Sequence, residues 1–511
     1  MEPVAMMLDQ TQTPFLSALQ ICAQRPQAAF YTPGHKRGQG APARLRDLLG
    51  EAALRADLPE LTELDNLFAP EGAILQAQAL AAAAFGAEQT YFLANGSTCG
   101  LEAAILAVCN PGDKILVPRN AHRSVVAGLV LAGARPVFVE PEYAPDLGLA
   151  LGLPAGTVAE ALAHHPDARA VLVVSPTYHG MTSDLEAIAA IAHRHSIPLL
   201  VDEAHGPHFA FHPDLPAPAL HQGADLVVQS THKVLSALSQ ASMLHVQGNR
   251  IDRDRLQAAL QLTQSTSPNS LLLASLDAAR YQMATEGKAL LSNTLALAQT
   301  LREQLAMLPG LRVIAPQDVA AYASVRDLDL TRTTVDVAAL GITGLEADEI
   351  LNDTLGVTVE LPELRHLTLV VSLGNTTADG DHCIEGFRQL VARCGSASLA
   401  SPTIAASSPD ILPSSGPTFP SPPFTLPPLS PREAFFAPTV TLPAAEALGH
   451  LSAETLSAYP PGIPTVMAGE EITAAALAHL ATVAQQGGYV TGASDPTLHT
   501  LKVIRTPTPQ G

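Results

Sequence analysis

Strand and helix patterns alternate along the middle of this chain, and the alternation constrains the fold more than any other sequence feature. Short apolar, β-branched runs predict buried strands, and helical patterns fill the longer segments between them. The predicted strands are Thr90–Leu93, Lys114–Val117, Pro136–Val139, Ala170–Val174, Ile197–Val201 and Asp225–Val228. Repeated strand–helix units predict an α/β fold with a mostly parallel sheet that helices cover on both faces.

Polar clusters follow four of these strands. Parallel strands bring their carboxyl ends to one edge of the sheet, which is where open α/β sheets bind ligands. The clusters are Gly96-Ser97-Thr98, His122, Asp202 to His205 and Ser230 to Lys233. Each cluster alone has an ordinary explanation, as a helix N-cap, a loop histidine or a polar surface turn. Their common position at one edge indicates a ligand site more strongly than any single cluster does.

One small molecule would use all of these groups. The helix start that contains Ser97 and Thr98 offers backbone N–H groups and hydroxyls to a phosphate. The amine of Lys233 can condense with an aldehyde. A buried Asp202 carboxylate can keep a proton on a ring nitrogen, and the imidazole of His122 can lie flat on the ring. Together these properties predict pyridoxal 5′-phosphate as the cofactor.

Composition and charge exclude several other classes of protein. The 511-residue chain has a net charge of −20 and no basic stripe, which argues against a nucleic-acid partner. Its first twelve residues lack a signal-peptide pattern, and the apolar stretch 75–85 is too short to cross a membrane. Five scattered cysteines, without a Cys-x-x-Cys pair, predict free thiols in a reducing cytoplasm and no metal site.

The sequence predicts five segments along the chain. An N-terminal arm and helix (1–60) precede a large cofactor-binding domain (61–300) and a smaller α+β domain (301–394). A Ser/Pro-rich linker (395–432) then leads to a C-terminal domain (433–511).

Eight motifs follow one another over nearly the whole chain. They are Thr32-Pro33-Gly34-His35-Lys36, Phe92 to Thr98, Val117 to Val125, Val201 to Gly206, Ser230 to Lys233, Gln264 to Pro268, Ser430 to Pro438 and Tyr459 to Pro464. In these motifs and in their order, the chain resembles the ornithine/lysine/arginine decarboxylase family, in its short form. The resemblance implies a fold-type-I, aspartate-aminotransferase-like large domain with a smaller α+β domain and a C-terminal domain.

The resemblance also implies roles for the matched residues. Lys233 is expected to bind the cofactor covalently, Asp202 to pair with its ring nitrogen and His122 to stack on the ring. Catalytic roles are expected for these three residues and His232. The other residues expected to hold or border the cofactor are Gly96, Ser97, Thr98, His205, Ser230 and His232. Those expected near the substrate, in a site that a dimer interface could share, are Thr32, His35 and Glu470.

The activity implied by the resemblance is pyridoxal-phosphate-dependent decarboxylation of a basic L-amino acid to an amine and CO2. A homodimer or larger homo-oligomer and a role in polyamine synthesis are implied with it. The sequence leaves arginine, lysine and ornithine open as substrates. Another activity on the same fold, such as an aminotransferase or aldolase, is one alternative, and a catalytically inactive regulator is another. The presence of Lys233, Asp202 and His122 together favours an enzyme over a regulator.

Overall fold

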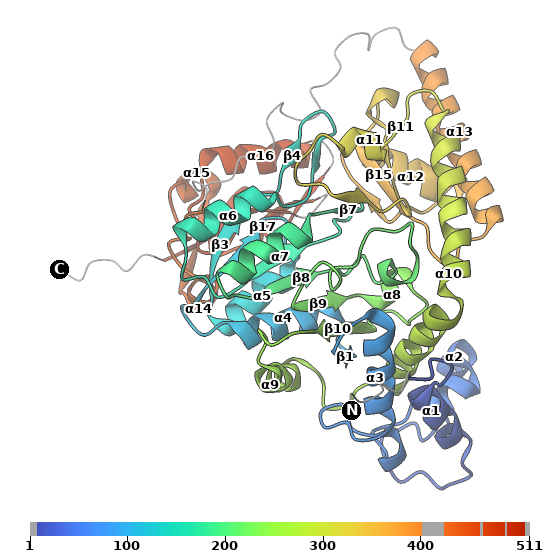
Figure 1. Cartoon of the computed structure of the whole chain (residues 1–511). Coiled ribbons are helices and arrows are strands. Elements are labelled where there is room, and N and C mark those ends of the chain that lie inside the picture. The colour runs from blue at the N-terminus through green and yellow to red at the C-terminus, as the bar shows by residue number, and fades with distance from the viewer. Residues whose placement is uncertain (1–7, 401–423, 460–462, 486–487, 506–511) are drawn as a thin grey trace. The chain divides into compact units, whose positions relative to one another are not determined.

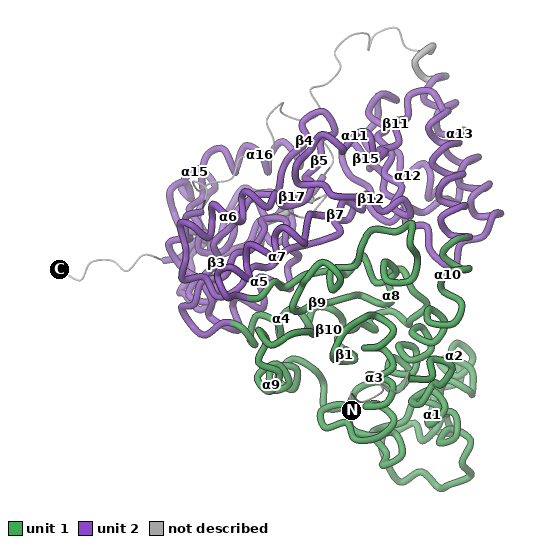
Figure 2. Tube along the Cα trace, in the orientation of Figure 1, with its two compact units in different colours: residues 1–108, 198–292 green, residues 109–197, 293–511 purple. Residues whose placement is uncertain are grey.

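The computed structural model describes residues 8–400, 424–459, 463–485 and 488–505. Two compact units divide the chain, as Figure 2 shows in two colours. Unit 1 comprises residues 1–108 and 198–292, and unit 2 comprises residues 109–197 and 293–511. Both units therefore draw residues from the predicted large domain, and the five predicted segments stay a prediction. Much of the Ser/Pro-rich linker, residues 401–423, lies outside the described residues.

The described residues of unit 1 form strands in the order β1-β10-β9-β8 (Figure 1). Their bounds are β1 Gln89–Leu93, β8 Leu199–Asp202, β9 Leu226–Gln229 and β10 Ser242–Val246. Strands β8 and β9 are parallel, and β10 runs antiparallel to both β9 and β1. Strand β1 therefore runs parallel to β9, so the carboxyl ends of β1, β8 and β9 lie at one edge of the sheet.

Seven α-helices among the described residues belong wholly or partly to unit 1. They are α1 Pro14–Gln24, α2 Ala43–Ala56, α3 Ala73–Phe85, α4 Gly96–Val108, α8 Thr231–Val234, α9 Arg253–Thr263 and α10 Ser270–Ala306, and α10 continues into unit 2. The sequence pattern predicts helices over 13–24, 73–85 and 101–108 and long helical segments over 254–306, and α1, α3, the body of α4 and the pair α9 and α10 form them. The short helix α8 and strand β10 were not predicted.

Helices α3 and α4 pack on opposite faces of the unit 1 sheet. The ring of Phe85, at the end of α3, stacks on His245 of β10 with 4.8 Å between ring centroids. On α4, a Cβ atom added to Gly100 would lie 2.9 Å from Cγ1 of Val228 on β9. Val228 pairs with Leu244, the neighbour of His245, and consecutive side chains of a strand point to opposite faces. The glycine thus lets α4 approach the face opposite to α3.

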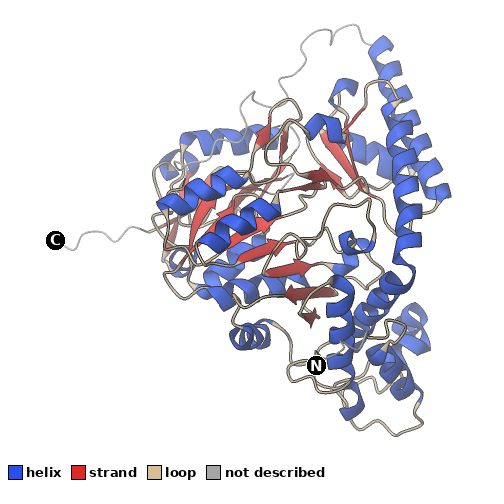
Figure 3. Cartoon of the chain, in the orientation of Figure 1, coloured by secondary structure: helices blue, strands red, loops and turns tan. Residues whose placement is uncertain are grey.

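Unit 2 contains a parallel group of strands and several small antiparallel sheets (Figure 3). The parallel group has the order β6-β2-β3, with β2 Lys114–Pro118, β3 Arg135–Val139 and β6 Val171–Val174. The other strands are β4 Tyr143–Ala144, β5 Leu149–Ala150, β7 Met181–Thr182, β11 Arg312–Val313, β12 Asp327–Leu328, β13 Arg332–Asp336, β14 Leu361–Pro362, β15 His366–Val370, β16 Thr439–Pro443, β17 Leu456–Tyr459, β18 Ile463–Val466, β19 Tyr489–Thr491 and β20 Thr500–Ile504.

The helices of unit 2 pack on these sheets and form separate apolar cores with them. These helices are α5 Arg123–Ala132, α6 Ala155–His164, α7 Leu185–Arg194, α11 Pro316–Val319, α12 Gly344–Leu355, α13 Thr377–Ala400, α14 Pro431–Phe436, α15 Ala444–Ala447 and α16 Ala474–Gln485. One core joins α12, β15 and α13 through Leu351, Leu367 and Phe387. Another joins β17 and α16 through Leu456 and Leu480. These cores stabilise the α+β region and the C-terminal region.

The strand directions confirm the predicted α/β class. The ladders β2–β3, β2–β6 and β8–β9 are parallel, and the β1–β10 and β9–β10 ladders are antiparallel. All helices in the described part of the chain fall short of the length or apolar character needed to cross a bilayer.

Candidate active site

Three of the predicted site residues meet in unit 1 around the amine of Lys233. Lys233 lies on α8, directly after β9, and its Nζ atom lies 3.0 Å from Nε2 of His205. Asp202 is the last residue of β8 and is 4% exposed. Burial raises the pKa of the Asp202 carboxyl, and the charge of Lys233 opposes this rise. The arrangement places a cation and a buried carboxyl group close enough to interact.

The start of α4 lies beside this group. Gly96 has a φ of +78°, a conformation that favours glycine, and it begins the helix. The hydroxyl of Ser230 donates a 2.8 Å hydrogen bond to Oγ of Ser97, which joins α4 to the residue before α8. Thr98 is exposed. Hydroxyl groups and the N–H groups of the first turn of a helix suit a phosphate, so this part of the chain fits the phosphate end of the predicted cofactor.

Two glutamines, neither of them a predicted site residue, form hydrogen bonds with the turn before α4. The N–H of Ala94 donates to Oε1 of Gln264 at 2.9 Å, and Nε2 of Gln240 donates to the carbonyl of Ala94 at 2.6 Å. Both polar groups of Ala94 are therefore fixed two residues before Gly96. Gln264 begins one of the eight motifs, and that position was the only signal of its importance.

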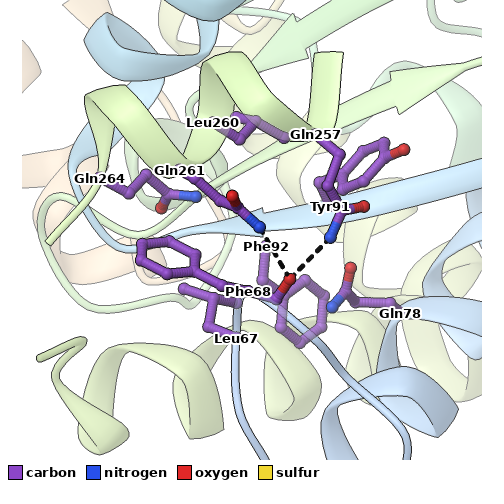
Figure 4. Close-up of a pocket in the computed structure, with 9 residues that line it drawn as sticks. All are labelled: Leu67, Phe68, Gln78, Tyr91, Phe92, Gln257, Leu260, Gln261 and Gln264. Carbon is purple, nitrogen blue, oxygen red and sulfur yellow. Dashed lines mark hydrogen bonds between the residues drawn. The ribbon is translucent and has the colours of Figure 1, made fainter. Parts of the chain in front are cut away.

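Gln264 also lines a small cavity next to α9 (Figure 4). The side chains of Gln257 and Gln261 donate to the carbonyl of Phe68, at 2.8 and 3.3 Å. The cavity has a volume of about 10 Å³, which suits one water molecule and excludes an amino acid. An open groove of about 710 Å³ lies elsewhere in unit 1, and none of the predicted site residues lines it.

His232 is held by the residue that precedes β10. Its Nδ1 lies 3.0 Å from the carbonyl oxygen of Ala241, which only accepts, so Nδ1 carries the proton. Burial lowers the pKa of His232. In the neutral ring Nε2 is then an acceptor, so a phosphate contact through Nε2 requires the bound anion to raise this pKa again.

His122 and Glu470 belong to unit 2. His122 is exposed and caps the N-terminus of α5, because its Nδ1 accepts a hydrogen bond from the N–H of Ser124 at 3.2 Å. The stacking of His122 on the cofactor ring stays a prediction. In the same loop, Arg119 donates to both carboxylate oxygens of Glu470, each at 2.6 Å. The N–H of Met467 donates to the same carboxylate at 2.9 Å.

The Arg119–Glu470 pair is almost completely buried, with side chains 3% and 1% exposed. It joins the His122 loop to the C-terminal region of unit 2. The substrate contact expected of Glu470 stays a prediction, and the structure gives this carboxylate a cationic partner that sequence reasoning missed. The two residues are 351 positions apart in the sequence, so no local pattern revealed the pair.

The N-terminal arm that contains Thr32 and His35 forms its own hydrogen bonds within unit 1. Nδ1 of His35 accepts from the N–H of Gly38 at 3.0 Å, and Nε2 lies 3.0 Å from a carboxylate oxygen of Asp57. Both ring nitrogens of His35 therefore stabilise the arm. The expected contacts of Thr32 and His35 with a substrate stay predictions.

Comparison with known proteins identifies the family of this chain. The family model described as "Orn/Lys/Arg decarboxylase, major domain" matches residues 13–376. The chain belongs to the Orn/Lys/Arg decarboxylase family. An arginine decarboxylase of Bacillus subtilis (strain 168) is 36% identical over 498 residues, which are 98% of this chain and 99% of the relative. An arginine decarboxylase of Bacillus anthracis is 38% identical and covers 98% of both chains.

A solved structure supports the fold of this decarboxylase. The lysine decarboxylase LdcF of Francisella novicida matches with a TM-score of 0.81 and 23% identity, over 97% of this chain and 81% of the other. The fold predicted from the resemblance is confirmed. The family match and the arginine decarboxylases also confirm the prediction of an amino-acid decarboxylase.

Proposed function

We propose that this protein is a pyridoxal-phosphate-dependent decarboxylase of L-arginine, which releases CO2 and agmatine. The observation that carries the proposal is the meeting of Lys233, the buried Asp202 and the hydroxyl-bearing start of α4 within unit 1. A lysine amine, a buried acid and an anion-binding helix start are the groups that pyridoxal phosphate requires.

Different residues of unit 1 would bind different parts of the cofactor. Lys233 would hold the aldehyde carbon, and Asp202 would keep a proton on the ring nitrogen. Ser97, Thr98 and Ser230 would donate to the phosphate, together with the N–H groups of the first turn of α4. His205 would border the ring substituents, and the stacking role predicted for His122 completes the proposed set.

When bound, pyridoxal phosphate supplies an electron sink for the electron pair that remains when CO2 leaves. The charged Asp202 carboxylate would stabilise the protonated ring nitrogen, and its burial strengthens this interaction. The proton that replaces CO2 on Cα must come from a nearby donor. The Nδ1 proton of His232 is used by Ala241, so we infer that Lys233, next to His205, donates it.

Arginine is the substrate that the comparisons favour over lysine and ornithine. The two arginine decarboxylases match nearly the whole chain at 36% and 38% identity. The lysine decarboxylase of Francisella novicida matches at 23%, which supports the fold and not the substrate.

The experiment that tests the proposal compares the three basic amino acids. Purified protein with pyridoxal phosphate is incubated with each one, and the amine product is identified by mass. We expect agmatine from arginine at a turnover well above that of lysine or ornithine, and none with Lys233→Ala. Faster release of an amine from lysine or ornithine would overturn the substrate, and turnover that requires a keto acid would indicate an aminotransferase.

We also infer a cytoplasmic homodimer or larger homo-oligomer that supplies an amine for polyamine synthesis. Large apolar side chains are exposed around the N-terminal arm of unit 1, among them Phe30 at 95% and Leu48 at 79%. Exposed apolar patches are typical of protein interfaces. None of the five cysteines forms a disulfide, which supports a reducing compartment. Sedimentation equilibrium of the wild type and of Phe30→Ser with Leu48→Ser tests the assembly, and the variant is expected to dissociate at higher concentration.

A further inference from the structure

A chain of buried polar side chains crosses the unit 1 sheet beneath the candidate site. Nε2 of Gln229 donates to Oε2 of Glu203 at 2.7 Å, and Oε1 of Gln229 lies 3.0 Å from Nε2 of His245. Nδ1 of His245 lies 2.8 Å from the hydroxyl of Thr90. The N–H of Ala219 donates to the second oxygen of Glu203 at 2.7 Å. Strands β1, β10 and β9 and the end of β8 are thus joined by side chains as well as by backbone.

The direction of every hydrogen bond in this chain is fixed. An amide oxygen only accepts, so Nε2 of His245 must carry a proton and donate to Gln229. Burial lowers the pKa of His245 to about 3, so the ring is neutral and Nδ1 has no proton. The Thr90 hydroxyl therefore donates to Nδ1. Donation runs from Thr90 through His245 and Gln229 to Glu203, which accepts at both oxygens.

These hydrogen-bonded polar side chains lie on the sheet face opposite to the candidate site. Glu203 follows Asp202 and extends the β8–β9 ladder, since its N–H donates to the carbonyl of Val228 at 2.9 Å. Gln229 likewise precedes Ser230. Consecutive residues of a strand point to opposite faces, so Glu203 and Gln229 share the α3 face with His245, while Asp202 and Ser230 share the α4 face.

A carboxyl group at position 203 is costly for folding. Glu203 is 1% exposed, and burial raises its pKa to about 8 although Gln229 and the N–H of Ala219 oppose the rise. An apolar side chain of similar size would avoid this cost. Costly buried polar groups are concentrated at functional sites. Glu203 lies next to such a site, because the preceding residue is Asp202.

We propose that Glu203, Gln229 and His245 are positioning residues, which fix the carboxyl ends of β8 and β9 so that Asp202 and Ser230 reach the cofactor from the other face. The proposal rests on the proposed function, because it assumes that pyridoxal phosphate binds there. None of the three touches the cofactor. Glu203 and Gln229 act through the backbone of their neighbours Asp202 and Ser230, and His245 acts by holding Gln229.

The test exchanges the carboxyl group of Glu203 and the amide of Gln229, which are hydrogen-bonded to each other. In Gln229→Glu two carboxyl groups meet in a buried place, and in Glu203→Gln two amides meet. In the double variant Glu203→Gln/Gln229→Glu, the amide introduced at position 203 accepts from Ala219 and donates to the carboxylate introduced at position 229. That carboxylate still accepts from His245. Every hydrogen bond can therefore be restored, and the four proteins form a double-mutant cycle.

The readouts are the dissociation constant of pyridoxal phosphate and the visible absorbance of the bound cofactor. We expect Gln229→Glu to weaken cofactor binding about 10-fold or more, since small displacements at a site have large effects. Glu203→Gln is expected to weaken it less, and the exchange to return it to within about 3-fold of the wild type. If Gln229→Glu does not fold, its affinity cannot be measured. The proposal is then supported if the double variant Glu203→Gln/Gln229→Glu folds and binds the cofactor.

Asp225→Asn is the matched control. Asp225 is a buried carboxylate at the opposite, amino end of β9, where it accepts from the N–H of Leu199 at 2.8 Å. We expect this variant to unfold at lower urea concentration without a change in cofactor affinity or absorbance. Equal loss of affinity in Asp225→Asn, or an exchange variant no better than Gln229→Glu, would overturn the positioning role. A wild-type protein that binds no pyridoxal phosphate would refute the proposed function itself.

Discussion

The amine of Lys233 and the imidazole of His205 lie 3.0 Å apart, although they follow different strands of unit 1. His205 is buried in the loop after β8, whereas Lys233 lies on the short helix after β9. Because β8 and β9 are parallel, both residues leave the sheet at the same edge. The histidine therefore restricts the position of the amine before any ligand arrives.

Replacement of His205 is predicted to impair turnover more than folding. In His205→Asn the Lys233 amine loses the ring that orients it, and misplacement of a reacting group lowers kcat by about 10²-fold. Steady-state kinetics with arginine and urea unfolding measure the two effects. His212→Asn is the control, because His212 is a buried histidine that lies 3.0 Å from the hydroxyl of Ser292. A kcat equal to that of the wild type would contradict the role of His205.

The Arg119–Glu470 pair is predicted to stabilise unit 2. Removing one partner from a buried ion pair costs about 3–5 kcal/mol, because the other charge is left buried and unpaired. Glu470→Ala should therefore lower the free energy of unfolding in urea by about this amount. Asp318→Asn, which removes a partly exposed partner of Arg312, should cost about 1 kcal/mol or less.

A different result would support the contact with substrate that the sequence predicts for Glu470. If Glu470→Gln raised the KM for arginine and left both kcat and the urea midpoint unchanged, the carboxylate would act on the substrate. The structural role of the ion pair would then be wrong.

Gly100 is predicted to determine how closely α4 packs on the sheet. In Gly100→Ala the new methyl would lie 2.7 Å from Cδ1 of Leu93 and 2.9 Å from Cγ1 of Val228, so these side chains or the helix must shift. Overpacking of this kind costs about 1–3 kcal/mol, and the shift should weaken binding of pyridoxal phosphate at the start of α4. In Gly156→Ala on α6 no atom lies within 4 Å of the new methyl. This control should stabilise the protein by about 0.5–1 kcal/mol and leave cofactor affinity unchanged.

Acid is predicted to destabilise the protein through His245. The pKa of His245 is lowered to about 3 in the folded protein from an ordinary value of 6.5. Between these values the unfolded chain binds a proton that the folded protein does not, so stability is lost as pH falls from about 6.5 towards 3. The slope approaches about 1.4 kcal/mol per pH unit. Urea unfolding at pH 7 and pH 5 should show a smaller loss for His245→Asn than for the wild type, and equal losses would contradict the prediction.

Sequence patterns predicted the parts of the fold that depend on local periodicity. Apolar runs predicted β2, β3, β6, β8 and β9, and helical periodicity predicted α1 and α3. Strand β10 was missed because its five residues include Ser242 and His245 and no turn signal separates it clearly from α8. The sequence therefore predicted the parallel strands and not the antiparallel one inserted between β1 and β9.

The candidate site shows the same division between local and distant information. The motifs identified Lys233, Asp202 and the start of α4, because each follows a recognisable strand. Their surroundings depend on residues from elsewhere in the chain, since Gln264 accepts a hydrogen bond from Ala94 in the turn before α4. Glu470 pairs in the same way with the distant Arg119 in the loop that contains His122. A hydrogen bond between residues far apart in sequence leaves no periodic pattern, so only the folded chain reveals it.

The attachment of the cofactor to Lys233 is the central claim, and chemical trapping tests it most directly. Protein loaded with pyridoxal phosphate is reduced with borohydride and digested, and the peptides are mapped by mass. The chain has four other lysines, Lys36, Lys114, Lys288 and Lys502, which serve as internal controls. We predict a pyridoxyl group on Lys233 and none on the other four. A label on another lysine, or no label at Lys233, would contradict the account.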